Sequence, residues 1–278
     1  MHIRLINNPD IIQSSALNIG INLSQGDYIM RLDAHCVYPE DYFKKLIETA
    51  VRSDADNVGG IIITHPGGPG YGAQLVQALT THKFGVGNSG FRTGAAEGYA
   101  DTVPFGFFKK EIFNKIGIFD KKLIRCQDYE FNCRIIKNGG KIWMNPYIQT
   151  DYYNQPTLWK FLKKQITKEA PYNPYMWYLY RYTFAYRHGI TGVFAFFFII
   201  GLVLSFLFTW ARLLFISVMA VYLLLAIASS VQQAIKYKKV LHLFTLPVSF
   251  FLFHFLHGIG IWIGISKLIL GISPVQKR

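Results

Sequence analysis

The pattern of apolar and polar positions changes character at about residue 150. Before that point, short apolar runs of strand length alternate with amphipathic stretches of helical period, and glycines and prolines separate them. The strand-like runs are Tyr28 to Leu32, Val58 to Thr64 and Lys141 to Met144, and the clearest helical stretch is Pro39 to Arg52. This alternation predicts a globular α/β domain over residues 1–150.

The segment from His65 to Ala100 interrupts the alternation because it is rich in glycine. It contains HPGGPGYG and GVGNSGFRTGAAEG. Glycine weakens the interior of helices and strands, so the sequence predicts a long loop system here instead of regular elements. Loops of this length commonly carry function.

Three long apolar runs occupy the last third of the chain, within residues 189–270. The first, Ile190 to Trp210, is about 20 residues long, as a helix needs in order to cross a hydrocarbon core. Only Ala211 and Arg212 separate it from the second, Leu213 to Val231, so the two runs predict a tight helical hairpin. Burial in a soluble core is the alternative, which three such runs in succession disfavour.

The third apolar run, from about Leu241 to Ile265, is less regular. Pro247 and the glycines at 258, 260 and 264 interrupt it, and it contains two histidines. A tilted helix that crosses the membrane and a broken helix that re-enters both suit this pattern. We therefore expect about three transmembrane helices, with the third crossing left open.

Residues 151–188 combine basic with aromatic side chains, in LWKFLKKQITKEA and PYMWYLYRYTFAYRH. Because Trp and Tyr favour the headgroup level and Lys and Arg face anionic lipid, this segment predicts interfacial helices, with ordinary amphipathic surface helices as the alternative. The loop 232–240 is basic, whereas only Arg212 lies at the hairpin tip. The positive-inside tendency then predicts a multi-pass protein of the cell (cytoplasmic) membrane whose N-terminal domain is cytoplasmic.

Composition and charge agree with a membrane location. The 278 residues include 29 Lys and Arg against 16 Asp and Glu, a net charge of +13, and 51% are hydrophobic. Beside three apolar runs, this positive surplus favours the lipid bilayer and phosphorylated substrates as partners. Because no nucleic-acid motif is present, we expect no nucleic-acid partner. Cys36, Cys126 and Cys133 form no CxxC pair and are expected to be free thiols.

Two acidic motifs are the candidates for chemistry. In GDYIMRLDAHCVYPEDYF an apolar strand ends in Asp33-Ala34-His35, at the strand end where α/β sheets bind ligands. An acid and an imidazole at this spacing can reach one divalent ion, although a strand-end acid beside a surface histidine is the simpler interpretation. In QDYEFNCRIIKNGGKIW, Asp128 and Glu130 begin a predicted helix, where acids often serve only the helix dipole.

Taken in order, these motifs resemble family 2 glycosyltransferases of the GT-A type. The resemblance rests on NNPDIIQSSALNIGINLSQGDYIMRLDAH, VPFGFFKKEIFNKIGIFD and QDYEFNCRIIKNGGKIW, and it extends to FGVGNSGFR, DTVPFG and HFLHGIGIWIG. The membrane-bound glucosyltransferases of succinoglycan exopolysaccharide biosynthesis are the most similar members. The resemblance implies a partial, Rossmann-like GT-A domain. It also implies an inverting transfer of a sugar, glucose first of all, from a UDP-sugar to a polyprenyl-diphosphate-linked saccharide.

The same resemblance assigns roles to residues. Asp33 and His35 would stand in the DxD-type motif, which holds the nucleotide-sugar and a divalent cation, Mn²⁺ or Mg²⁺, and the histidine favours Mn²⁺. Asp128 would be the base that takes the proton from the acceptor hydroxyl, and Asn18 would belong to a donor-side turn. The residues expected on the acceptor side are Asn88, Arg92, Gln165, Glu130 and Arg134. A structural role is the alternative for the last two, and an ordinary interfacial role is the alternative around Gln165.

Two features depart from the family pattern. Gln127 stands where a glutamate usually precedes the base. The family also begins with a strand, a helix and a second strand that grip the uracil and ribose, whereas here Met1 is followed almost at once by the third-strand region IRLINNP. We therefore expect an N-terminally truncated domain with an exposed sheet edge. The alternative to an enzyme is a non-catalytic membrane remnant or assembly component of a polysaccharide-synthesis complex.

Overall fold

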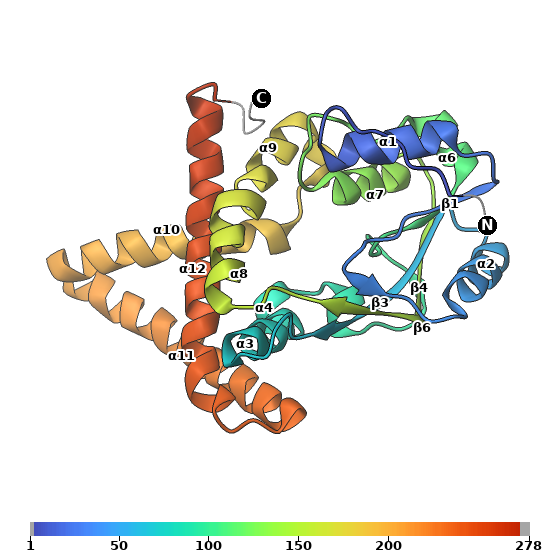
Figure 1. Cartoon of the computed structure of the whole chain (residues 1–278). Helices are drawn as coiled ribbons and strands as arrows, with labels where there is room; N and C mark the ends of the chain where they lie inside the picture. The colour runs from blue at the N-terminus through green and yellow to red at the C-terminus, as the bar shows by residue number, and fades with distance from the viewer. Residues whose placement is uncertain (1–2, 273–278) are drawn as a thin grey trace.

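The computed structural model describes residues 3–272, which form a mixed sheet with helices on both faces and a set of long helices that follows it (Figure 1). The strand order is β1-β5-β3-β6-β2, and β4 pairs with β6 outside that path. Strands β3 and β6 run parallel, and the other pairs run antiparallel. The strands are β1 (Tyr28–Met30), β2 (Cys36–Val37), β3 (Asn57–His65), β4 (Gly98–Tyr99), β5 (Phe107–Lys109) and β6 (Ile142–Tyr153).

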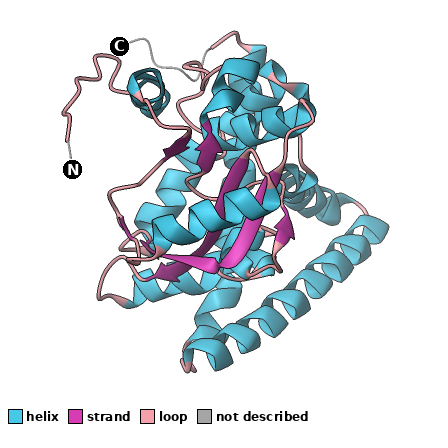
Figure 2. Ribbon diagram, turned by 90° about the vertical axis from the view of Figure 1, so that its right-hand side faces the viewer, coloured by secondary structure: helices cyan, strands magenta, loops and turns pink. Residues whose placement is uncertain are grey.

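Helices cover both faces of this sheet (Figure 2). On one face, α1, α6 and α7 bury a cluster that includes Ile21, Phe113 and Phe131. On the other face, α2 buries Leu46 and Ala50 against β3 and β6. The helices of this part are α1 (Gln13–Leu23), α2 (Tyr42–Ser53), α3 (Tyr71–Thr80), α4 (Lys83–Val86), α5 (Gly90–Thr93), α6 (Lys110–Ile116) and α7 (Gln127–Lys137). The prediction of an α/β domain is confirmed.

The structure corrects two expectations in this domain. The segment 65–100 is not a loop system, because α3 buries Val76 and Leu79 and its only interior glycine is Gly72, in the first turn. The expected third-strand region at the N-terminus forms no strand: residues 3–8 have no regular structure, and Leu5 is fully exposed. Among the described residues, no strand pairs with the outer edge of β1.

The basic and aromatic segment forms four short helical elements that lead from the sheet to the long helices. They are α8 (Leu158–Lys164), a π-helix η1 (Gln165–Glu169), α9 (Tyr172–Leu179) and a 3₁₀ helix η2 (Arg181–Thr183). Elements α8, η1 and α9 contact α12. Strand β6 continues to Tyr153, so the sheet extends slightly past the expected boundary at residue 150.

Among residues 3–272, three helices are long and apolar enough to cross a membrane, by length and composition, as the sequence predicted: α10 (Tyr186–Leu207), α11 (Thr209–Tyr237) and α12 (His242–Ile269). The hairpin turn between the first two is shorter than expected. Helix α11 begins directly after Phe208, and Arg212 lies inside it. From there, Arg212 Nε donates to the Ser205 carbonyl oxygen at 3.0 Å, which satisfies one of the free carbonyls at the end of α10.

Helix α12 lies between the α10–α11 hairpin and the sheet domain (Figure 1). It is continuous through Pro247, and its glycines serve packing instead of breaking the helix. A Cβ at Gly258 would lie 2.1 Å from the Thr191 carbonyl oxygen, and one at Gly264 would lie 2.5 Å from that of Pro171. On its sheet-domain side, Phe250 is buried together with residues of α3 and α8. The spans and the sheet domain therefore share a hydrophobic core.

Candidate active site

A cavity of about 450 Å³ lies between the sheet domain and the first turn of α10. Arg31, Asp33 and His35 reach it from the segment after β1, Asp128 reaches it from the first turn of α7, and Arg187 reaches it from α10. The cavity therefore collects one acid from each of the two motifs, together with several cations. It also places them beside a candidate membrane span.

Arg31 connects the two acids. Its Nε and Nη2 donate to the two carboxylate oxygens of Asp33 at 2.8 and 3.0 Å, and its Nη1 donates to Asp128 Oδ1. The Arg31 side chain is only 8% exposed. Burial favours the neutral guanidinium, but the carboxylates of Asp128 and Asp33 outweigh this effect and raise its pKa, so Arg31 stays charged. One buried cation thus links the expected metal ligand, Asp33, to the expected base, Asp128.

Asp128 is positioned by the start of α7. The helix begins at Gln127, and the residue before it, Cys126, adopts a left-handed conformation (φ 63°) that turns the chain sharply into the helix. The Asp128 side chain faces the cavity and keeps 41% of its surface accessible, and the protein atoms around it bury the rest. This burial raises the pKa of the carboxyl, Arg31 opposes the rise, and the Asp33 charge adds to it. Asp128 is thus a stronger base than an ordinary aspartate.

The cavity offers two metal ligands of its own. Asp33 and His35 both line it, and the His35 ring lies edge-on to Tyr152 at 5.1 Å. Within residues 3–272, no three His, Cys, Asp or Glu side chains converge on one point. Divalent cations that act with phosphates are often held by one or two protein groups, with phosphate oxygens and water as the other ligands. The donor set therefore fits a cation that arrives with a diphosphate, provided that Arg31 yields its bonds to Asp33.

Of the expected acceptor-side residues, the cavity includes Arg92. Its guanidinium lies 5.2 Å from the Phe91 ring centroid and 5.4 Å from that of Tyr152, and its Nη1 is buried without a hydrogen-bond partner. An unpaired cationic donor on a cavity wall suits a phosphate or sugar oxygen. Asn88 is exposed and lies outside the cavity lining, and Gln165 also lies outside it, whereas the adjacent Lys164 lines it.

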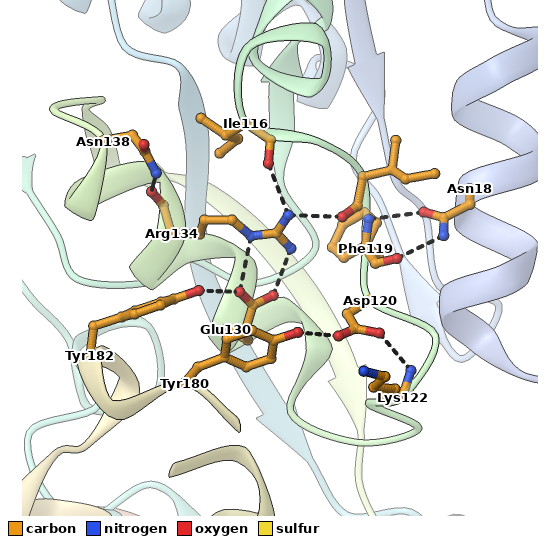
Figure 3. Close-up of polar contacts among 11 residues, drawn as sticks. Asn18, Ile116, Phe119, Asp120, Lys122, Glu130, Arg134, Asn138, Tyr180 and Tyr182 are labelled. Atoms are coloured by element: carbon orange, nitrogen blue, oxygen red, sulfur yellow. Dashed lines mark hydrogen bonds and ion pairs between the residues drawn. The ribbon is translucent and has the colours of Figure 1, made fainter. Parts of the chain in front are cut away.

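Asn18, Glu130 and Arg134 lie away from the cavity, in the buried network of Figure 3. Asn18 exchanges two hydrogen bonds with the backbone of Phe119, at 2.8 and 3.0 Å, which ties α1 to the loop before α7. Glu130 is 0% exposed and accepts two bonds from Arg134, at 2.9 and 2.7 Å, and one from the Tyr182 hydroxyl at 2.7 Å. Asn18 thus lies outside the cavity, and its donor-side role stays a prediction. For Glu130 and Arg134 the geometry favours the structural of the two expected roles.

Several cavity residues were not identified from the sequence. Arg31 was within reach, because it lies two positions before Asp33 and side chains two apart on an extended chain share a face. Glu169 and Arg125 meet only through the fold, with Arg125 Nη1 3.7 Å from Glu169 Oε1. Lys164 Nζ lies 3.3 Å from the same oxygen. Arg187, which pairs with Asp101, also carries no local signal in the sequence.

The three cysteines are free in the structure, as predicted. Burial raises the pKa of each thiol, and that of Cys133 rises to about 11. The side chains therefore remain protonated at neutral pH, although Cys126 lines the cavity. They are neither thiolate ligands for a metal nor nucleophiles in this state.

Comparison with known proteins places these features in a family context. Residues 1–117 match the sequence model of glycosyl transferase family 2. The chain is 30% identical over 276 residues to the dolichyl N-acetyl-alpha-D-glucosaminyl phosphate 3-beta-D-2,3-diacetamido-2,3-dideoxy-beta-D-glucuronosyltransferase of Methanococcus voltae, which covers 96% of this chain and 79% of that protein.

A second relative is the succinoglycan biosynthesis protein ExoA of Rhizobium meliloti (strain 1021), 32% identical over 162 residues, or 56% of this chain. The chain spans about half the length of this relative, since the match covers 48% of it. Among solved structures, GalNAc-T7 with UDP, GalNAc and Mn²⁺ superposes with a TM-score of 0.39 at 16% identity, over 62% of this chain and 37% of that one.

Proposed function

Because the chain belongs to glycosyl transferase family 2, we propose that it is an inverting hexosyltransferase that moves a sugar from a nucleotide-sugar to a lipid-linked saccharide. The observation that carries this proposal is the shared cavity of Asp33, His35 and Asp128 beside the candidate membrane spans. The pathway would be the synthesis of an exopolysaccharide or another cell-surface polysaccharide, as the name of the Rhizobium relative suggests.

The proposed reaction follows from the two acids. Asp128 accepts the proton of an acceptor hydroxyl while that oxygen bonds to the anomeric carbon of the donor sugar. The bond between the anomeric carbon and the diphosphate oxygen breaks in the same step, and its electron pair leaves with the nucleoside diphosphate. Attack opposite the leaving group inverts the configuration. The raised pKa of Asp128 suits it to this step, because a stronger base takes the proton more readily.

Asp33 and His35 would hold the divalent cation, Mn²⁺ or Mg²⁺. When bound, the cation would neutralise the charge that develops on the diphosphate. Arg31 has a complementary part in this scheme: once Asp33 is engaged, the guanidinium keeps its bond to Asp128 and holds that carboxylate toward the acceptor side. Arg92, with its unpaired Nη1, is placed to bind an oxygen of the donor or acceptor.

The partners are a UDP-sugar, with glucose as the first candidate, and a polyprenyl-diphosphate-linked saccharide. The name of the Methanococcus relative describes a sugar carried on dolichyl phosphate, and this supports a lipid-linked acceptor. The three candidate spans support a multi-pass protein of the cytoplasmic membrane. We place the sheet domain on the cytoplasmic side because positive charge gathers in the 232–240 loop rather than at the hairpin tip.

The test is a transfer assay on the protein in lipid nanodiscs, supplied with Mn²⁺, radiolabelled UDP-sugars and polyprenyl-diphosphate-linked saccharides. We expect labelled glycolipid from the unaltered chain and a loss of about 10²–10⁴-fold for Asp128→Asn, as for removal of a general base. Binding of UDP should stay within twofold in that variant, whereas His35→Ala should weaken Mn²⁺-dependent UDP binding. The exposed Asp54, whose side chain is 77% accessible, provides the control Asp54→Asn. Equal loss of transfer and nucleotide binding in both site variants would contradict the assigned roles.

A second candidate is a non-catalytic assembly component of a polysaccharide-synthesis complex. One observation favours it: Arg31 bonds both carboxylate oxygens of Asp33, the proposed metal ligand, and one oxygen of Asp128. This candidate predicts no Mn²⁺-dependent UDP binding and no labelled glycolipid with any donor. Nucleotide binding without transfer would support neither candidate in full and would point to a wrong acceptor.

A further inference from the structure

A second cavity, of about 460 Å³, lies among α4, α10, α11 and α12. Its walls are mainly apolar and include Phe84, Ile190, Phe194 and Phe253. Apart from the α4 segment, its lining residues belong to the three candidate spans. A volume of this size lies within the range of about 300–1,000 Å³ that is usual for small-molecule sites.

This cavity adjoins the candidate active site. The same three residues, Val86, Arg187 and His188, line both cavities. The active-site cavity is rich in charged side chains, whereas the second one lies in the apolar region below it. A ligand that passes between Val86 and Arg187 would therefore have a polar part in one cavity and an apolar part in the other.

The polar groups deep in the second cavity are already paired with each other. His254 Nδ1 lies 2.8 Å from the Tyr222 hydroxyl, and His257 Nδ1 lies 2.8 Å from Thr191 Oγ1. Because these groups satisfy one another, the deep part needs no polar ligand.

The junction between the cavities differs from the deep part because it carries charge. Arg187 lies there and also pairs with Asp101, and Lys83, one helical turn before Val86 on α4, lines the second cavity. The Nδ1 atom of His188 is buried without a hydrogen-bond partner. Arg187 and an unpaired imidazole nitrogen at the junction, with Lys83 one turn away, face one carboxylate, and this balance favours an anionic group at this point.

We propose that the second cavity holds the first isoprenoid units of the acceptor lipid, a polyprenyl phosphate or diphosphate. Its phosphate lies at the junction near Lys83, Arg187 and His188, and its saccharide lies in the active-site cavity. This inference rests on the proposed function for the identity of the lipid. It adds the place of the lipid chain and the residues that select it.

Photo-crosslinking tests the site without any sugar transfer. The probe is a polyprenyl phosphate with a diazirine on its first isoprene unit, added to the purified full chain in detergent with no donor and no metal. We expect labelled peptides from α4, the first two turns of α10, or the 253–257 part of α12. Unlabelled polyprenyl phosphate should compete, and phosphatidylglycerol at the same concentration should not.

Two matched variants of α10 sharpen the test. Ile190 is 61% exposed and lines the cavity, whereas Val193 is 65% exposed and does not. Ile190→Trp should fill the cavity and lower labelling at least fivefold, while Val193→Trp should leave it unchanged. Equal labelling of the two variants would overturn the proposal, as would labelling spread over the outer faces of α10 and α11. Equal competition by phosphatidylglycerol would show a general lipid site and would also overturn it.

Failure of this inference is distinguishable from failure of the proposed function. If the chain transfers sugar but the label falls elsewhere, the lipid site is wrong and the transferase stands. If the label falls as expected and no donor gives transfer, the lipid site stands without the enzyme. Val193→Trp should retain the transfer rate of the unaltered chain, because Val193 lines neither cavity.

Discussion

At the scale of single residues, the central feature is one arginine between two acids. Arg31 holds Asp33 through two hydrogen bonds and Asp128 through a third, so the proposed metal ligand and the proposed base are coupled through one side chain. A cation that binds Asp33 must compete with the guanidinium. Arg31 is therefore expected to affect both donor binding and proton transfer.

The first prediction concerns pH. Asp128 must be ionised to act as a base, so activity is lost as the pH falls through its folded-state pKa, which lies above that of an ordinary aspartate. Arg31 opposes this rise, so Arg31→Gln should move the acid limb of the kcat/KM profile to higher pH. The control is Lys44→Gln, since the Lys44 side chain is 77% exposed. An acid limb at the same pH in Arg31→Gln and the unaltered chain would show that Asp128 is not the titrating group.

The sequence identified the residue types of the cavity better than their contacts. Asp33, His35, Asp128 and Arg92, singled out by motif and resemblance, all line it. Their roles remain predictions. Asn18 shows the limit of the approach, because a motif does not reveal whether an amide faces a ligand or, as here, a neighbouring backbone. The neighbours Lys164 and Gln165 are another example, because adjacent residues on a helix face different directions and only Lys164 lines the cavity.

At the scale of elements, α7 has two functions on two faces. One face presents Asp128 to the cavity. The other face carries Glu130, which bonds Tyr182 of η2, in the segment between the sheet and α10. Arg134 extends the network to the carbonyl oxygens of Ile116 and Ile118, both at 3.0 Å (Figure 3). The position of the proposed base therefore depends on buried polar contacts with the segment that leads to the membrane.

This network gives the second prediction. Glu130→Ala leaves the Arg134 guanidinium, 18% exposed, without its buried partner and should cost about 3–5 kcal/mol of stability. The paired change Glu130→Met with Arg134→Met should cost less, because it removes both charges. Thermal unfolding in detergent measures both, with Glu48→Ala at an exposed pair as the control, expected within about 0.5 kcal/mol. If Glu130→Ala unfolds like Glu48→Ala, the network does not stabilise the domain.

The third prediction concerns helix packing. Gly258→Ala places a Cβ 2.1 Å from the Thr191 carbonyl oxygen and should force α10 away from α12, at a cost of about 1–3 kcal/mol. Gly20→Ala in α1 is the matched control, because no atom lies within 4 Å of its added Cβ, and it should stabilise by up to about 1 kcal/mol. Detergent unfolding curves compare the two. A change in stability for Gly258→Ala that equals the change for Gly20→Ala in size and sign would contradict the packing role of Gly258.

Elements were predictable where the hydropathy signal was long. The three apolar runs and the helix near Pro39 to Arg52 match observed helices, because length and period agree there. The prediction of a loop over 65–100 was wrong because it relied on the glycines that flank α3. The apolar residues of YGAQLVQALT form a helix that packs against α12, a partner distant in sequence. Packing partners distant in sequence cannot be read from one local pattern.

At the scale of the whole molecule, α12 joins the sheet domain to the other two candidate spans. Tyr71 of α3 illustrates the connection, since its hydroxyl lies 2.8 Å from His242 Nδ1 and 2.7 Å from Thr245 Oγ1 of the α12 start. Gln233 of α11 adds a bond to the Ala78 carbonyl oxygen at 2.6 Å. The candidate active-site cavity is therefore joined to the helices by direct contacts.

The fourth prediction is the orientation of the chain in the membrane. In a variant whose three cysteines are replaced by serine, a single cysteine at Trp210, near the hairpin tip, should react with a membrane-impermeant maleimide in intact cells. A single cysteine at Lys239 should react only after permeabilisation. The positive-inside tendency gives this direction, because the basic loop faces the cytoplasm. The reverse labelling pattern would place the sheet domain outside.

The wall of Val86, Arg187 and His188 between the two cavities sets a length scale for the acceptor. With the lipid phosphate at this wall and the reacting hydroxyl at Asp128, the saccharide between the two points would have to fit within the active-site cavity of about 450 Å³. The protein would then select its acceptor by the length of the saccharide between the lipid phosphate and the reacting hydroxyl. A longer glycan would carry its growing end past the base, so such a transferase would add its sugar at one early stage and stop.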